Sequence, residues 1–209
     1  LTTQGVPVTA PTASRSTIKS LGDLAAESGL QRVHMLAWRD LDDVEAGGSE
    51  VHAHNIASLW AQAGIDVLHR TSFAAGRPQK VTRSGYRVVR KAGRYMVFPR
   101  SVAAELAHRN GPRDGLVEIW NGVPFLSPLW CPGPRMIWLH HVHGPMWDMS
   151  LPPGLARAGR VFEERIAPVT HEHVRLRPVY SNTASHVSVT WVKPARARDL
   201  VSCRLVKFT

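Results

Sequence analysis

The stretch RVHMLAWRDLDDVEAGGSEVHAHNIASLWAQAGIDVLHR, residues 32–70, decides the fold prediction, because strand, loop, helix and strand signals follow one another within it. RVHMLAW (32–38) is an apolar run bounded by polar residues, which predicts a buried parallel strand. RDLDDVEAGGSE (39–50) follows as a loop, and IDVLHR (65–70) predicts a second strand. This order is that of a βαβ unit with parallel strands.

A helix is predicted between these strands, over residues 49–63. Its apolar residues take the i, i+3, i+4 and i+7 positions of one helix face. They are Ile56, Leu59, Trp60 and Ala63. Gly64 follows where a C-terminal cap is expected. We expect this face to pack against the sheet.

Strand and helix signals continue to alternate along the chain. YRVVRK (86–91) and YMVFP (95–99) predict a short hairpin or edge pair, and a helix is expected over Pro99 to Arg109. GLVEIW (115–120) and RMIWLH (135–140) predict two further strands. The alternation predicts an α/β fold, with a parallel sheet and helices on both of its faces.

Length and composition limit the class of protein. At 209 residues the chain has room for one full domain and part of a second. The hydrophobic content of 44% predicts a buried core, and no apolar run reaches the roughly 18 residues of a membrane span. Residues 1–20 hold no apolar signal core. Cys131 and Cys203 form neither a metal cluster nor a disulfide framework, so we expect a cytoplasmic protein.

The net charge of +10 raises an alternative function, that of a basic module that binds nucleic acid or an anionic surface. Residues 160–209 hold nine Lys and Arg against four Asp and Glu, which is half of the excess. The scattered cations elsewhere, as in RVVRKAGR (87–94), also suit an anionic membrane surface, a phosphorylated ligand or simple solvation.

Two loops are placed where ligands bind in parallel sheets, beyond the carboxyl ends of the strands. In the first, Gly47 and Gly48 precede the helix; glycines allow close backbone approach, and free N–H groups at a helix start favour anions. Simple capping of the helix would explain the same residues. The second loop, in WLHHVHGPMWDM (138–149), begins with three histidines.

The histidines at 140, 141 and 143 could form a metal site, a polar ligand-binding edge or a structural cluster packed by Trp138 and Trp147. A metal is disfavoured, because alternation along a strand turns His140 away from the other two. His52 and His54 lie about 200° apart on a helix and do not complete such a site. A metal hydrolase stays the weakest alternative.

The combination and order of AGGSEVHAHNIASLWAQAGIDV (46–67), EIWNGVPFLSPLW (118–130) and MIWLHHVHGPMWDMSLPPGLARAGRVFEERIAP (136–168) resemble family 4 glycosyltransferases. These are retaining enzymes of the GT-B fold, in which two Rossmann-like domains face each other across a cleft. The similarity covers Arg32 to Pro168 and implies the amino-terminal, acceptor-side domain.

The resemblance implies roles for named residues. A histidine after the strand MIWLH lies at the edge of the reaction centre in that family, and the match falls on His140 or His143 as the catalytic candidate. Substrate-binding roles are implied for residues of the two loops and the strand end. They are Gly47, Gly48, Ser49, Asn121, His141 and Trp147.

The resemblance also implies partners. These are a nucleotide-sugar donor, which is a co-substrate and not a cofactor, and a glycan, lipid or small-molecule acceptor for a hexose. No metal is expected, since helix ends and basic side chains can stabilise the leaving diphosphate. Nucleic acid is not expected as a partner either. Peripheral contact with the inner face of an anionic membrane fits the charge.

The predicted domain plan has a tail (1–31), the Rossmann-like domain (32–168) and a second tail (169–209). The second tail shows no strand or helix period and no serine-rich strand of the kind that the family resemblance implies. We interpret it as an out-of-frame stretch or the start of a missing second domain, so a fragment without the donor-binding domain is expected to be inactive alone.

Overall fold

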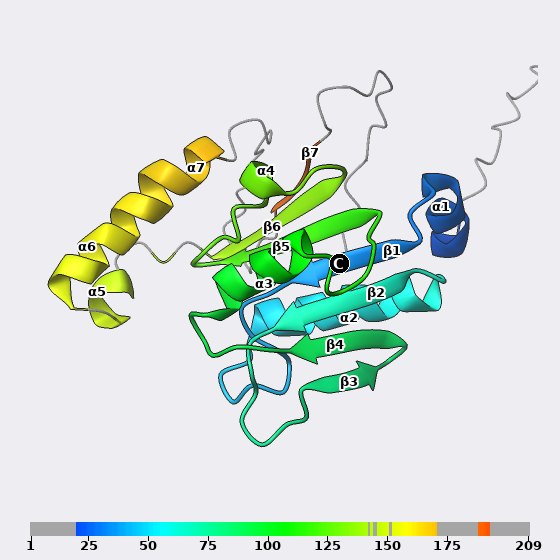
Figure 1. Cartoon of the computed structure of the whole chain (residues 1–209), viewed down its shortest axis with the longest axis horizontal. Helices are drawn as coiled ribbons and strands as arrows, with labels where there is room; N and C mark the ends of the chain where they lie inside the picture. The colour runs from blue at the N-terminus through cyan, green and yellow to red at the C-terminus, as the bar shows by residue number, and fades with distance from the viewer. Residues whose placement is uncertain (1–19, 142, 144–145, 151, 171–187, 193–209) are drawn as a thin grey trace, which may run out of the picture.

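The computed structural model (Figure 1) describes residues 20–141, 143, 146–150, 152–170 and 188–192, which form an α/β fold around one mostly parallel sheet. The seven strands lie in the order β3-β4-β2-β1-β5-β6-β7. Their bounds are β1 Arg32–Leu36, β2 Asp66–Thr71, β3 Lys80–Arg83, β4 Tyr86–Arg90, β5 Gly115–Asn121, β6 Arg135–His141 and β7 Ser188–Val192. Only β3 and β7, at the two edges, run antiparallel to their neighbours.

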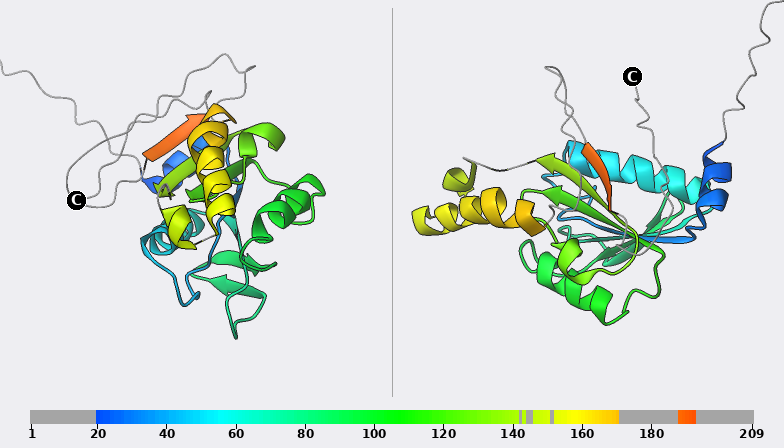
Figure 2. Two further views of the ribbon diagram at one scale, coloured as in Figure 1. Left: turned by 90° about the vertical axis from the view of Figure 1, so that its left-hand side faces the viewer. Right: turned by 90° about the horizontal axis from the view of Figure 1, so that it is seen from above.

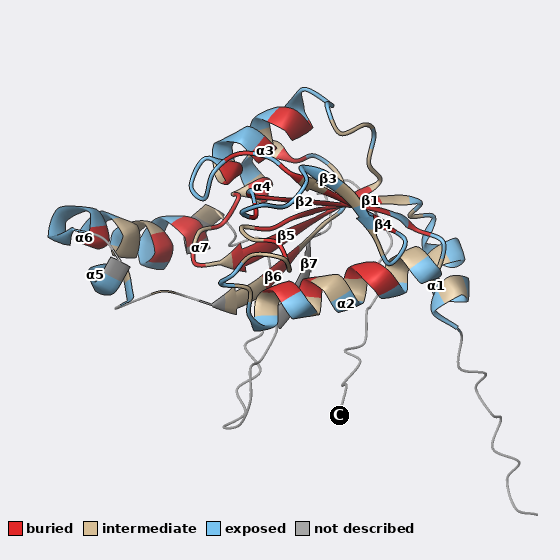
Figure 3. Ribbon diagram, turned by 90° about the horizontal axis from the view of Figure 1, so that it is seen from below, coloured by how far each residue is buried: buried red, intermediate tan, exposed pale blue. Residues whose placement is uncertain are grey.

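Helices cover both faces of the sheet, as the alternation predicted. Helix α2 packs on one face, while α3 and α4 lie on the other, which two views of the ribbon show from opposite sides (Figures 2 and 3). The helices are α1 Leu21–Ser28, α2 Gly48–Gln62, α3 Val97–Leu106, α4 Ser127–Trp130, α5 Trp147–Ser150, α6 Pro153–Val161 and α7 Ala167–Thr170. A π-helical segment, Phe162–Ile166, joins α6 to α7.

The largest buried cluster lies between α2 and the central strands, where Figure 3 shows the sheet almost wholly buried. The predicted apolar face of α2 is partly wrong. Leu59 is exposed, whereas the small residues Ala53 and Ala57 are buried against the sheet and Ile56 and Trp60 pack beside them. Small side chains bring the helix close to the strands, so the contact face is turned relative to the one that large apolar residues mark.

The edge of the sheet also differs from the prediction. Tyr86–Arg90 pairs with Lys80–Arg83, not with residues 95–99, which belong to the start of α3. The turn that joins β3 to β4 is Ser84–Gly85, with φ of +47° and +86°. Two successive left-handed residues form the tight turn whose twist suits a two-residue hairpin, and this fixes the pairing.

Regular elements also occur in both segments predicted as tails. Helix α1 lies within residues 1–31, where Ser20 caps it and exchanges hydrogen bonds with Asp23 in a capping box. Within residues 169–209, the strand Ser188–Val192 extends the sheet by pairing antiparallel with β6. The first helix shows a local capping signal in the sequence, whereas the second element depends on a long-range partner.

Candidate functional site

The chain reverses its direction of travel across the sheet between β1 and β5. From β1 it passes through α2 to β2 on one side, and from β4 it passes through α3 back to β5 on the other side of β1. The loops after β1 and β5 therefore separate at the carboxyl edge, which is where open α/β sheets bind ligands. We define this part of the structure, residues 37–50 and 121–126 with His140 near the end of β6 and His143 just after it, as the switch-point edge.

The start of α2 presents backbone donors at this edge. Gly47 is the N-cap, and its own N–H donates to Glu50 Oε2 at 2.7 Å. The first hydrogen bond inside the helix comes from Val51 N–H to the Gly47 carbonyl. The N–H groups of Gly48, Ser49 and Glu50 precede that bond and have no acceptor within the helix. A Cβ atom placed on Gly48 would meet no atom within 4 Å, and Gly47 and Gly48 are exposed, so the first turn of the helix is open to solvent.

A direct hydrogen bond joins the loop after β1 to the end of β5. The Asn121 side chain donates from Nδ2 to Ser49 Oγ at 2.9 Å, and both residues were predicted to bind substrate. Asn121 is half-buried, as the last residue of β5. The bond spans the two strands between which the chain reverses, so it places the glycine loop and the strand end in one small region.

His140 faces the α2 side of the sheet. It follows Trp138 by two residues in β6, so both side chains point to the same face. The His140 and His52 rings lie 5.1 Å apart, and the His52 and Trp138 rings 5.0 Å apart. Within the described residues, His52 Nδ1 and His140 Nε2 are buried without a hydrogen-bond partner.

The protonation of these two rings is shifted by their surroundings. Burial, together with the nearby His52, lowers the pKa of His140 to about 4, and burial also lowers the pKa of His52. Both rings are therefore neutral near pH 7 and act as hydrogen-bonding groups, not as cations.

His143 lies over the end of β5. A Cβ atom placed on Gly122 would come within 1.8 Å of His143 Cε1, so only a glycine leaves room for this ring. The backbone N–H of His143 donates to Glu163 Oε1 at 2.8 Å, and Trp147 Nε1 donates to Glu163 Oε2 at 2.8 Å. The rings of His143 and Trp147 lie 5.0 Å apart. Glu163 thus holds both residues in place.

Aromatic and charged side chains complete the edge at the end of β1. The Trp38 ring lies 6.1 Å from the His143 ring. The guanidinium carbons of Arg39 and Arg94 lie 4.9 and 5.1 Å from the centre of the Trp38 ring, within the range of cation–π contacts. Glu45 pairs with both arginines. Its pKa is lowered, mainly by the hydrogen bond from Arg94.

A buried ion network holds the loop after β1 against the β3–β4 hairpin. Asp40 accepts from Arg90 Nε at 2.6 Å and from Arg83 Nη1 at 2.9 Å, and Arg90 also donates to Asp42 at 2.6 Å. Burial opposes the charge of Asp40, but the two arginines lower its pKa to about 2. The loop that ends in Gly47 and Gly48 is therefore fixed at its beginning by two arginines of the hairpin.

The loop after β5 is fixed by a buried carboxylate. Glu118 accepts from the backbone N–H groups of Phe125, Leu126 and Ser127 at 2.5, 3.1 and 2.8 Å. Leu126 has a left-handed φ of +56°, which such hydrogen bonds help to maintain. The rigid loop keeps Asn121 and Gly122 in place at the switch-point edge.

Most of the candidate residues meet at this edge. Gly47, Gly48 and Ser49 lie there with Asn121. The His140 ring contacts His52 of α2, and the His143 ring lies over Gly122. The side chain of His141 lies outside the described part of the structure.

Trp147 bonds to Glu163 and stacks near His143, so it acts on the site through His143. Sequence reasoning missed Glu163, Trp38 and Gly122. Glu163 carries no local signal, because it lies twenty residues after the histidine that it holds.

No group of three or more His, Cys, Asp or Glu side chains in the described residues is arranged to hold a metal ion. Nor does any described helix combine the length and apolar character that crossing a bilayer requires. A scan against models of protein families finds no match to this chain, and a search of curated proteins finds no significant match. Function is therefore inferred below from the geometry of the switch-point edge.

Proposed function

We propose that this chain is the acceptor-side half of a nucleotide-sugar-dependent glycosyltransferase with a GT-B fold, related to family 4. The observation that carries the proposal is the hydrogen bond between Ser49 and Asn121, at 2.9 Å. It brings the glycine-rich helix start to the strand end at the switch point, where open α/β sheets bind ligands. Open N–H donors at this position suit a diphosphate or a phosphate-bearing acceptor.

Roles follow from the chemistry of the individual groups. In the transfer of a hexose, the bond from the anomeric carbon to the diphosphate oxygen breaks, and an acceptor hydroxyl forms the new bond to that carbon. Negative charge develops on the departing phosphate oxygen, which can take up the proton of the acceptor hydroxyl. The N–H groups at Gly48 and Ser49 would stabilise that charge, as donors positioned before the reaction do. His140 and His143 are the candidate catalytic residues, and a neutral imidazole such as His140 can donate one hydrogen bond to a sugar or phosphate oxygen.

The proposal gives this chain a binding role and leaves the donor to a second domain. In a GT-B enzyme the reacting groups are aligned across a cleft between two domains, and that alignment supplies much of the rate. The 209-residue chain alone is expected to bind a diphosphate-bearing ligand weakly without transferring sugar. Glycan, lipid and small-molecule acceptors, cytoplasmic location and contact with an anionic membrane are consistent with this proposal.

The test compares binding to two aspartate variants by NMR, with pyrophosphate, UDP-glucose and GDP-mannose as probes. Gly48→Asp places a carboxylate in the first turn of α2, where it meets open space and repels an anion without harming the helix. Gly154→Asp is the matched control, because Gly154 lies in the first turn of α6 and also faces open space.

We expect at least one probe to shift the backbone amides of Gly48, Ser49 and Glu50. Gly48→Asp should weaken that binding by about tenfold, which is about 1.4 kcal/mol, while Gly154→Asp leaves it unchanged. Absence of these shifts with all three probes contradicts the proposal. So does an equal effect of the two variants, and so does preferential binding of random duplex DNA with a steep salt dependence.

A further inference from the structure

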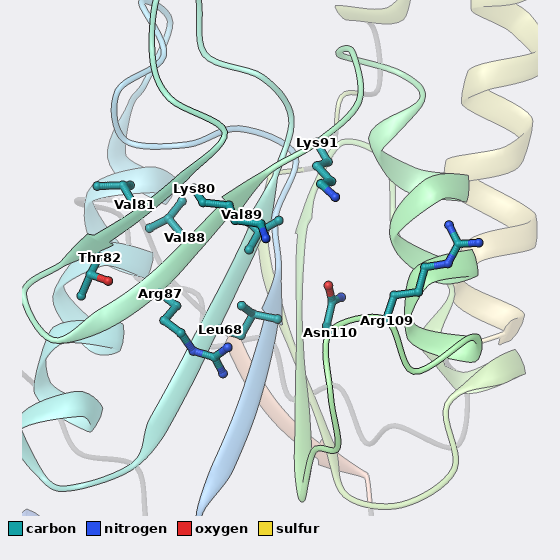
Figure 4. Close-up of a pocket in the computed structure, with 10 residues that line it drawn as sticks. All are labelled: Leu68, Lys80, Val81, Thr82, Arg87, Val88, Val89, Lys91, Arg109 and Asn110. Carbon is teal, nitrogen blue, oxygen red and sulfur yellow. The ribbon is translucent and has the colours of Figure 1, made fainter.

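A pocket lies away from the switch-point edge, on the face of the sheet formed by β2, β3 and β4 (Figure 4). Its volume is about 380 Å³, within the range of small-molecule sites. The strands contribute one wall, and Arg109 and Asn110, from the loop after α3, form the other. In Figure 1, no helix of the described residues covers this face of β3 and β4.

The pocket combines an apolar floor with a basic rim. Leu68 and Val89 lie at its centre in Figure 4, and cationic side chains surround them. The cations that line it are Lys80, Arg87, Lys91 and Arg109. Arg87 is paired with Asp66 at 2.9 Å, whereas Lys80, Lys91 and Arg109 form no ion pair with the described residues.

Two opposite buried charges lie behind the wall and fix Asn110. Arg70 pairs with Val89 in the sheet and lies two residues after Leu68, on the same face. Among the described residues it donates to Ser101 at 2.9 Å and to Asn110 and Arg100 at 3.3 Å each. The Asn110 amide also donates to the buried Glu105 carboxylate at 2.7 Å, and this carboxylate offsets the charge of Arg70. The positive potential of the pocket therefore comes from the cations of its rim.

The charge of the chain argues against one of its own segments as the occupant. Residues 1–19, 171–187 and 193–209 each carry more Lys and Arg than Asp and Glu. Such segments do not complement a rim of free lysines and arginine. A small anion with an apolar or planar body complements both the rim and the floor.

We propose that this pocket binds a small organic phosphate, whose phosphate group contacts Lys80, Lys91 and Arg109 and whose apolar or planar part lies on Leu68 and Val89. The site is separate from the one proposed for sugar transfer, and it does not depend on that function. A ligand here contacts the hairpin whose Arg83 and Arg90 hold Asp40 in the loop after β1.

The test uses AMP as the probe, with inorganic phosphate and adenosine as partial probes, followed by NMR of the Leu68 and Val89 methyl groups. The variant is Lys80→Gln/Lys91→Gln. Its matched control is Arg157→Gln/Arg165→Gln, which removes the same charge from exposed positions on α6 and the π-helical segment. Thermal unfolding of all variants shows that each is folded.

We expect AMP to bind more tightly than adenosine or inorganic phosphate and to shift both methyl groups. The lysine variant should bind AMP at least about tenfold more weakly, which is about 1.4 kcal/mol, and the control should bind as the parent does. Arg109→Gln, from the opposite wall, should weaken AMP on its own and should have little further effect in the lysine variant, since one phosphate contacts both walls.

Several results would overturn the proposal. Equal loss of binding in the two double variants would mean that AMP senses only the net charge. Binding of AMP without shifts of Leu68 and Val89 would place the ligand elsewhere, and adenosine binding as tightly as AMP would exclude recognition of the phosphate. Gly48→Asp serves as the separating control, because it should not affect AMP binding at this pocket.

Discussion

Replacing Gly122 by alanine should disturb the position of His143 more than any other conservative change at the switch-point edge. The new Cβ would lie 1.8 Å from His143 Cε1, and real Cβ atoms do not approach closer than 3.0 Å, so the ring must move by at least about 1.2 Å. The Gly122 carbonyl accepts from the buried Trp120 Nε1 at 3.0 Å, which opposes movement of the backbone. The His143 ring therefore has to leave its contact with the Trp147 ring.

The expected cost has two sources. Gly122 has a φ of +84°, and a left-handed conformation costs an alanine roughly 1–2 kcal/mol. Overpacking against the His143 ring adds roughly 1–3 kcal/mol. Urea unfolding of Gly122→Ala should then show a loss of about 2–5 kcal/mol in the free energy of unfolding, with the His143 ring resonance displaced.

Gly111→Ala separates the two sources, because Gly111 has a φ of +88° and no atom within 4 Å of its Cβ position. It should lose only the roughly 1–2 kcal/mol of backbone strain. Removal of the ring in Gly122→Ala/His143→Ala should restore about 1–3 kcal/mol relative to the sum of the single variants. Equal losses for Gly122→Ala and Gly111→Ala, or strict additivity in the double variant, would refute the placement of His143 over Gly122.

Two further changes test the supports of this edge. Burial lowers the pKa of His69 to about 4, below the roughly 6.5 of an unfolded histidine. Between these two pH values the unfolded chain binds a proton at His69 that the folded chain does not, so the free energy of unfolding is at its full value above pH 6.5 and falls as the pH falls toward 4. His69→Leu should remove about 3 kcal/mol of that loss, seen as a shallower decline in unfolding free energy between pH 7 and 4; an unchanged decline would contradict a neutral buried His69. Asp40→Asn should lower the unfolding free energy by roughly 1–3 kcal/mol, because it removes the buried carboxylate that Arg83 and Arg90 share and leaves them only Asp42, and the retention of parent stability would show that this network does not hold the loop.

Local periodicity was sufficient to predict the central part of the sheet. The strands at 32–36 and 66–71, and the helix between them, follow from apolar runs and glycine positions that need no distant partner. The strand at 188–192 could not be predicted this way, since its only described partner is β6, more than forty residues earlier. The pairing of β4 was predicted wrongly because the decisive feature is the backbone conformation at Ser84 and Gly85, which their side chains only weakly encode.

In the candidate site, too, the local features were predicted and the long-range contacts were not. Gly47 and Gly48 were predicted from their position before a helix, and the rule for parallel sheets predicted that they share an edge with the loop that holds the histidines. The hydrogen bond of Ser49 to Asn121, and the hold of Glu163 on His143, depend on how β5 and the helix after residue 153 pack. Long-range contacts of this kind leave no pattern in one sequence.

The histidines in WLHHVHGPMWDM do not act together as a group of cations at the switch-point edge. His140 and His52 are buried against each other and neutral near pH 7, because an imidazolium there would lose its hydration without gaining an acid partner. Attraction for an anion must therefore come from the backbone donors at the start of α2, because Arg39, whose guanidinium lies over Trp38, is already paired with Glu45 and Glu50. This division fits a binding site in which fixed backbone dipoles attract a phosphate and neutral side chains select what the phosphate carries.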